Sequence, residues 1–134
     1  MLALSIRQPY AELILRGIKT AELRRMSTNI IGQRFYIYAP KVKAVAPVWS
    51  NDLDVAQPPS WMLELARQVK LIEPDADLPT GLLVGTAVIE KVEAPSDASA
   101  VASTIFMWHL ADVQRFKHPI KPSGHPQPVW WHND

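Results

Sequence analysis

Apolar and polar residues alternate in several short stretches of the chain, and this period of two predicts strands. The pattern is clear at residues 2–7 and again at residues 34–39, each with one apolar face. Another strand is predicted at residues 20–24, where Glu22 and Arg24 share a face. Three further strands are predicted at residues 82–92, with a bend at Gly85, at residues 104–116 and at residues 129–131.

Two other stretches have the spacing of helices. Apolar residues recur at i, i+3 and i+4 within residues 9–16, which predicts a short helix there. Gly17 follows it at the position where a left-handed conformation favours glycine. A second helix is predicted over residues 60–70, with Ser60 as its N-cap.

These elements follow one another as β-α-β-β-α-β-β-β, which predicts an α+β fold. The sheet is expected to be mixed and mostly antiparallel, flanked by the short helices, and to curl into a small barrel that protects its edges. A length of 134 residues without internal repeats predicts one domain over residues 1–134. Prolines predict a long excursion at residues 40–60 and a polar linker at 95–102, and the pattern leaves open whether the excursion covers a cleft.

The composition excludes several classes of protein and site. The chain has no cysteine, so it has no disulfide scaffold, thiolate zinc site or cysteine nucleophile, which fits a cytoplasmic location. No apolar run approaches the roughly 18 residues of a membrane span, and the first residues lack an apolar signal core. The four histidines lack metal-ligand spacing and no phosphate or dinucleotide loop is present, so we expect no metal and no cofactor.

Charge is distributed unevenly, although the net charge is only +1. Residues 1–43 hold eight Lys or Arg and two Glu, whereas residues 44–134 hold six basic and eleven acidic residues. This segregation indicates an anionic partner for the first third of the chain. Alternatively, the positive and negative parts of the chain neutralise each other within the fold.

The first third also contains the strongest candidate site, formed by Lys19, Glu22 and Arg24. Two cations beside a carboxylate can hold a phosphate or a base edge, and a desolvated pair can transfer protons. The turn at Gly17 is expected to bring Lys19 to the side of Glu22. The alternative is an exposed ion pair worth about 0–1 kcal/mol.

Arg7 and Gln8 precede the first helix, so they are candidates for an anion site at its N-terminus or, alternatively, for a helix cap. Some aromatic residues could stack a base or could instead belong to the core. The strongest of these candidates are Tyr38 and Trp108, and the others are Tyr10 and Trp130.

The segment Leu4-Ser5-Ile6-Arg7-Gln8-Pro9-Tyr10-Ala11, followed by Gly17-x-Lys19-x-x-Glu22-x-Arg24, resembles the opening of ASCH domains of the PUA-like superfamily. The resemblance implies a β-barrel with a cleft flanked by the first helix and the signature strand. PUA-like relatives bind RNA or modified bases, and some ASCH proteins are similar to acetylcytidine amidohydrolases or ribonucleases. Where the amidohydrolases have a threonine nucleophile, this chain has Glu22.

We therefore expect a module that binds RNA or a nucleotide through Arg7, Gln8, Lys19, Glu22 and Arg24, with Tyr38 or Trp108 stacking on a base. The first alternative is a hydrolase of RNA or a modified nucleoside, in which Lys19 and Glu22 are catalytic. The second is a protein-interaction module that dimerises through residues 129–131. The expected state is a monomer or a weak homodimer, without a membrane partner.

Overall fold

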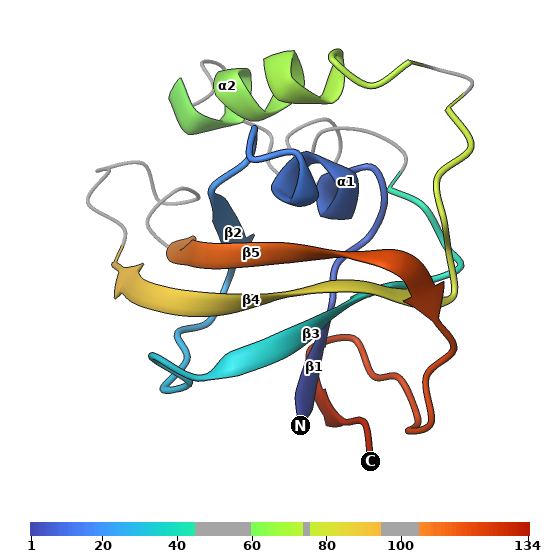
Figure 1. Cartoon of the computed structure of the whole chain (residues 1–134). Coiled ribbons are helices and arrows are strands. Elements are labelled where there is room, and N and C mark those ends of the chain that lie inside the picture. Colours follow the sequence, from blue (N-terminus) through green and yellow to red (C-terminus); the bar gives the residue numbers. More distant parts are fainter. Residues whose placement is uncertain (45–59, 74–75, 95–104) are drawn as a thin grey trace.

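The order of helices and strands in the structure is the one that the sequence pattern predicts. A computed structural model describes residues 1–44, 60–73, 76–94 and 105–134 (Figure 1). The predicted excursion at residues 40–60 and the linker at 95–102 lie largely outside the described residues. The elements in chain order are β1 (Leu2–Ser5), α1 (Tyr10–Leu15), β2 (Ala21–Arg24), β3 (Arg34–Ala39), α2 (Ser60–Val69), β4 (Leu82–Glu93), β5 (Phe106–Ile120) and β6 (Trp130–His132).

The strands form one mixed sheet in the order β2-β5-β4-β3-β1-β6. Among the described strands, β1 and β3 run parallel, while the other neighbouring pairs are antiparallel. The predicted closed barrel is wrong, because the described strands form a half-barrel in which β2 and β6 are the two edges and do not pair with each other. These edge strands have four and three residues, and side chains rather than a backbone ladder connect the two ends of the sheet. Arg24 of β2, for example, donates a hydrogen bond to the carbonyl oxygen of Ser5 in β1 over 2.6 Å.

The larger part of the core lies on one face of this sheet, and α1 packs against it. Phe35, Ile37 and Ala39 of β3 belong to this cluster. The alternating residues Tyr36 and Tyr38 belong to a smaller cluster on the opposite face, together with the C-terminal strand. Figure 1 shows α1 against the sheet and α2 farther out.

Gly85 allows α1 to approach β4 closely. A Cβ atom at this position would lie 2.8 Å from Cδ2 of Leu15 in α1 and 2.3 Å from the carbonyl oxygen of Gln114 in β5. The register of β4 against β5 shifts between Leu83 and Gly85, so the pairing is irregular at the glycine where the sequence predicts a bend. Among the described helices, none is long and apolar enough to cross a membrane.

Candidate functional site

The turn after α1 fixes the backbone of the candidate site. Gly17 has φ +75°, and its N–H donates to the carbonyl oxygen of Ile14 over 3.0 Å. The N–H groups of Ile18 and Lys19 both donate to the carbonyl oxygen of Leu13, over 3.0 and 3.1 Å. This is a Schellman-type helix end, which only glycine adopts without strain at the Gly17 position. The predicted role of Gly17 is confirmed, and the turn delivers Lys19 directly before β2.

Lys19, Glu22 and Arg24 form one continuous ionic network. The Lys19 ammonium donates to Oε1 of Glu22 over 3.0 Å and to the carbonyl oxygen of Ala21 over 2.6 Å. Nε of Arg24 donates to Oε2 of Glu22 over 2.8 Å. Lys19 therefore does reach the same side as Glu22, and the carboxylate lies between two cations.

This network is buried rather than exposed. Lys19 and Glu22 are only 6% and 7% exposed. Burial alone would raise the pKa of Glu22, but the charges and hydrogen bonds of Lys19 and Arg24 outweigh it, so the pKa of this carboxyl lies below its ordinary value. Glu22 is therefore ionised at neutral pH, and the network of two cations and one anion has a net charge of +1. The alternative of a weak surface ion pair does not apply.

Arg24 has acceptors for each of its nitrogen atoms. Besides Glu22, it donates to the carbonyl oxygen of Ser5 over 2.6 Å and to that of Pro128 over 3.3 Å. Its guanidinium also lies 5.9 Å from the ring centroid of Trp108. Because these contacts join β2, β1 and the segment before β6, Arg24 positions the carboxylate and holds the two ends of the half-barrel together.

Among the described residues, the Lys19 ammonium has fewer hydrogen-bond acceptors than N–H groups. An ammonium carries three N–H groups, and the described residues supply two acceptors, on Ala21 and Glu22. The ammonium also lies 5.8 Å from the ring centroid of the half-buried Tyr10. Burial and then the negative charge of Glu22 raise the pKa of the Tyr10 hydroxyl, so Tyr10 is protonated at neutral pH. The Lys19 ammonium thus lies over the Tyr10 ring in a cation–π contact.

Gln8 is part of the structural framework. It is fully buried, and its Nε2 donates to the carbonyl oxygen of Pro79 over 3.0 Å. Its Oε1 accepts a hydrogen bond from the N–H of Glu12 over 3.0 Å, which is the helix-capping role considered as the alternative. Arg7 is exposed. The N–H groups of Tyr10 and Ala11 both donate to the carbonyl oxygen of Arg7, so the start of α1 does not offer the free N–H groups on which the predicted anion site depends.

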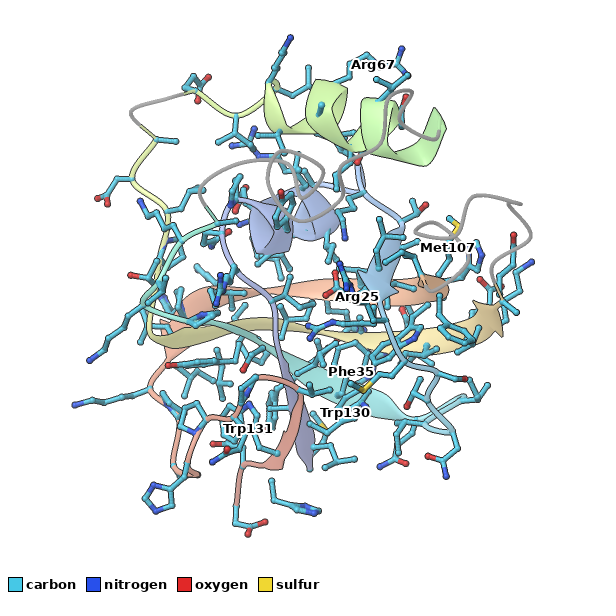
Figure 2. All side chains as sticks on the ribbon, turned by 180° about the vertical axis from the view of Figure 1, so that it is seen from behind. Arg25, Phe35, Arg67, Met107, Trp130 and Trp131 are labelled. Carbon is cyan, nitrogen blue, oxygen red and sulfur yellow. The ribbon has the colours of Figure 1, made fainter. Side chains whose placement is uncertain are left out.

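The two strongest aromatic candidates from the sequence lie in the core. Trp108 is 0% exposed and stacks on Trp130, with ring centroids 5.9 Å apart and an angle of 2° between the rings. Trp130 also packs edge-on against Phe35, with centroids 5.2 Å apart (Figure 2). Tyr38 is 6% exposed and packs against Trp131 in the cluster on the other face of the sheet. Neither Trp108 nor Tyr38 offers a face on which a base could stack in this structure.

Sequence reasoning missed a second buried carboxylate network. Glu12, which is 5% exposed, accepts hydrogen bonds from both terminal nitrogens of Arg115 over 3.0 and 2.8 Å and from Nε of Arg16 over 2.7 Å. The i, i+4 spacing of Glu12 and Arg16 could have indicated half of it. Arg115 lies 103 residues away in sequence and carries no local signal. This network ties α1 to β5. Among the described residues, no group of three or more His, Cys, Asp or Glu is placed to hold a metal ion.

Comparison with known proteins gives matches for the family and for the fold. The family model of the ASCH domain matches residues 4–120. The crystal structure of ASCH from Zymomonas mobilis is similar at 16% identity and a TM-score of 0.51, over 90% of this chain and 72% of that chain. A serine-to-alanine mutant of the Zymomonas mobilis protein has 16% identity, a TM-score of 0.49 and the same coverage. No curated protein matches the chain.

At this identity, the similarity to the first solved structure shows the fold alone. The family match covers most of the chain and includes Lys19, Glu22 and Arg24. ASCH domains are PUA-like domains, a group generally linked to RNA binding. The chain belongs to the ASCH domain family.

Proposed function

We propose that this ASCH domain binds RNA or a nucleotide at Lys19, with one base or phosphate held beside the ionic network. The observation that carries the proposal is the buried network of net charge +1, in which Lys19 keeps one N–H without an acceptor among the described residues. A buried positive charge with a free donor favours an anionic or carbonyl-bearing ligand, because such a ligand supplies the missing acceptor.

Each residue of the network has a separate role in this proposal. Lys19 donates to a phosphate oxygen or a base carbonyl. Glu22 orients Lys19, and Arg24 holds Glu22 in place. Tyr10 replaces Trp108 and Tyr38 as the ring against which a base packs, since it is half-buried and the Lys19 ammonium lies over it, 5.8 Å from its centroid. Single-stranded RNA is the favoured polymer, because its unpaired bases can be splayed out and stacked.

A hydrolase acting on RNA or a modified nucleoside is the second candidate. The separation of 3.0 Å between the Lys19 ammonium and Glu22 favours it, since a proton donor and acceptor in contact can act together. The lowered pKa of Glu22 opposes it, because a strongly stabilised carboxylate is a weak base at neutral pH. We therefore rank binding above catalysis.

Fluorescence anisotropy with short labelled single-stranded RNA and DNA tests both candidates. We expect Lys19→Met to weaken binding at least tenfold, while the matched change Lys117→Met leaves it unchanged. Lys117 is exposed on β5, seven residues from Leu110, whose N–H donates to the carbonyl oxygen of Thr20, or roughly 20 Å along the strand.

Controls separate loss of binding from loss of fold. Circular dichroism checks that Lys19→Met folds, and Tyr10→Leu provides a second variant that keeps the network and removes the stacking ring. Equal affinities of the wild type and both folded variants would refute the site. RNA shortened by the wild type but not by Glu22→Gln, as seen on a gel, would establish the hydrolase instead.

A further inference from the structure

Exposed cations gather at the end of the sheet where β1 and β3 stop, next to the start of α1. Arg7 follows β1, and Lys41 and Lys43 follow β3. Because β1 and β3 are parallel, the segments that follow their C-terminal residues emerge at the same end of the sheet. The N–H of Ala44 donates to the carbonyl oxygen of Gln8 over 2.8 Å, which holds the two segments side by side (Figure 1). We call Arg7, Lys41 and Lys43 the cationic strip.

The charges of the cationic strip are not neutralised by the described part of the chain. Arg7, Lys41 and Lys43 form no ion pair with any described residue. The segment that contains Asp77 passes nearby, because the carbonyl oxygen of Pro79 accepts from Gln8, but Asp77 is exposed and forms no ion pair with these cations. Three like charges at one end of the sheet repel one another unless an anion lies between them.

Backbone and side-chain contacts fix the position of the cationic strip relative to the Lys19 site. The N–H of Tyr10 donates to the carbonyl oxygen of Arg7 over 2.9 Å, so a single turn separates Arg7 from the ring beside Lys19. The aliphatic stem of Lys41 lies against Gly81, where a Cβ would be 3.1 Å from Cγ of Lys41. The segment that carries Lys41 is therefore packed against the body of the domain.

We infer that the cationic strip binds the phosphates of a single-stranded polynucleotide whose base or end occupies the Lys19 site. This inference rests on the proposed function and deepens it, because it assigns the ligand as a polymer rather than a free nucleotide. A mononucleotide would use Lys19 and Tyr10 alone. A strand would continue over Arg7 to Lys41 and Lys43, with each cation releasing counterions from the backbone.

The experiment compares a labelled single-stranded RNA octamer with uridine monophosphate. The strip variant is Arg7→Gln, Lys41→Gln and Lys43→Gln combined. The matched control is Arg25→Gln, Lys70→Gln and Lys91→Gln combined, which removes the same charge from exposed positions without ion pairs among the described residues. Octamer affinity is measured by anisotropy at several salt concentrations, and nucleotide affinity by calorimetry.

We expect the strip variant to lose roughly two units from the slope of log affinity against log salt, at about 0.7 per phosphate contact. Raising the salt from 50 to 200 mM would then weaken the wild type about 18-fold more than the strip variant. The control should keep the wild-type slope, and both variants should bind uridine monophosphate as the wild type does.

Other results overturn the inference in distinguishable ways. Equal slopes for the strip variant and the control would show that the strip does not bind the strand. An octamer that binds no more tightly than uridine monophosphate, with both lost in Lys19→Met, would leave the proposed function intact and refute the polymer. A wild type that binds neither molecule would refute the proposed function and this inference with it.

Discussion

Replacing Glu22 by glutamine tests whether the buried carboxylate holds the two cations together. The substitution keeps the shape of the side chain and removes its charge. Lys19 and Arg24 then remain as two positive charges, with side chains only 6% and 18% exposed. Removing one partner of a buried ion pair typically costs about 3–5 kcal/mol, because the remaining charge is desolvated without compensation.

The expected cost lies at the lower end of that range. The amide oxygen of glutamine can still accept one hydrogen bond, and Arg24 keeps its two backbone acceptors, the carbonyl oxygens of Ser5 and Pro128. We therefore expect Glu22→Gln to lower the free energy of unfolding by about 3 kcal/mol. In a domain of this size, that corresponds to a fall in Tm on the order of 10 °C.

Urea unfolding followed by tryptophan fluorescence measures this change. The matched control is Glu93→Gln, since the Glu93 side chain is 54% exposed and should contribute no more than about 0.5 kcal/mol. Adding Lys19→Met to Glu22→Gln should cost less than the sum of the single changes, because it removes one of the two unpaired cations. A Glu22→Gln protein as stable as the Glu93→Gln protein would refute the argument that the network is buried and coupled.

Three further predictions concern pH, the second network and the close approach of α1. The pKa values of Glu22 and Glu12 are lowered in the fold, so both carboxylates stabilise the fold at pH values above their ordinary pKa. This stability is lost as acid protonates them. Denaturation monitored by circular dichroism should therefore begin below about pH 4.5. Arg115→Leu should lower the free energy of unfolding in urea by about 1–2 kcal/mol, because it removes two hydrogen bonds from the buried Glu12 carboxylate. The loss is moderate because the Arg115 side chain is nearly half exposed. An unchanged stability would contradict this. Gly85→Ala should lower the free energy of unfolding by about 3 kcal/mol or prevent folding, because the new Cβ would lie 2.3 Å from the carbonyl oxygen of Gln114. A normally stable variant would show that β4 and β5 can separate there.

The features that were predicted correctly have a local cause. Alternation and helical spacing identify the order of the elements, because each pattern reflects which face of one segment is buried. Gly17 and the position of Lys19 were also accessible, since a helix end followed by glycine has few conformations. The spacing of Lys19 and Glu22 then follows from that turn.

The features that were missed depend on residues far apart in sequence. An open half-barrel and a closed barrel have the same strand patterns and differ only in whether β2 pairs with β6. The alternation in β5 assigns Trp108 to a face, but the burial of that face depends on Trp130 and Arg24, which come from other strands. The full burial of Gln8 depends on Pro79 in the same way.

The structure also bears on whether this ASCH domain acts by recognition or by proton transfer. A general base must accept a proton, and Glu22 could do so only by weakening its hydrogen bonds to both Lys19 and Arg24. That step leaves two buried cations without their shared anion, which is the same disruption that Glu22→Gln is expected to impose. A ligand carrying negative charge could offset the loss, because it would take the place of the carboxylate beside Lys19. Binding can thus use the network as it stands in the free domain. Hydrolysis would require a ligand that first displaces Glu22 from Lys19 and Arg24, and for this reason we favour binding.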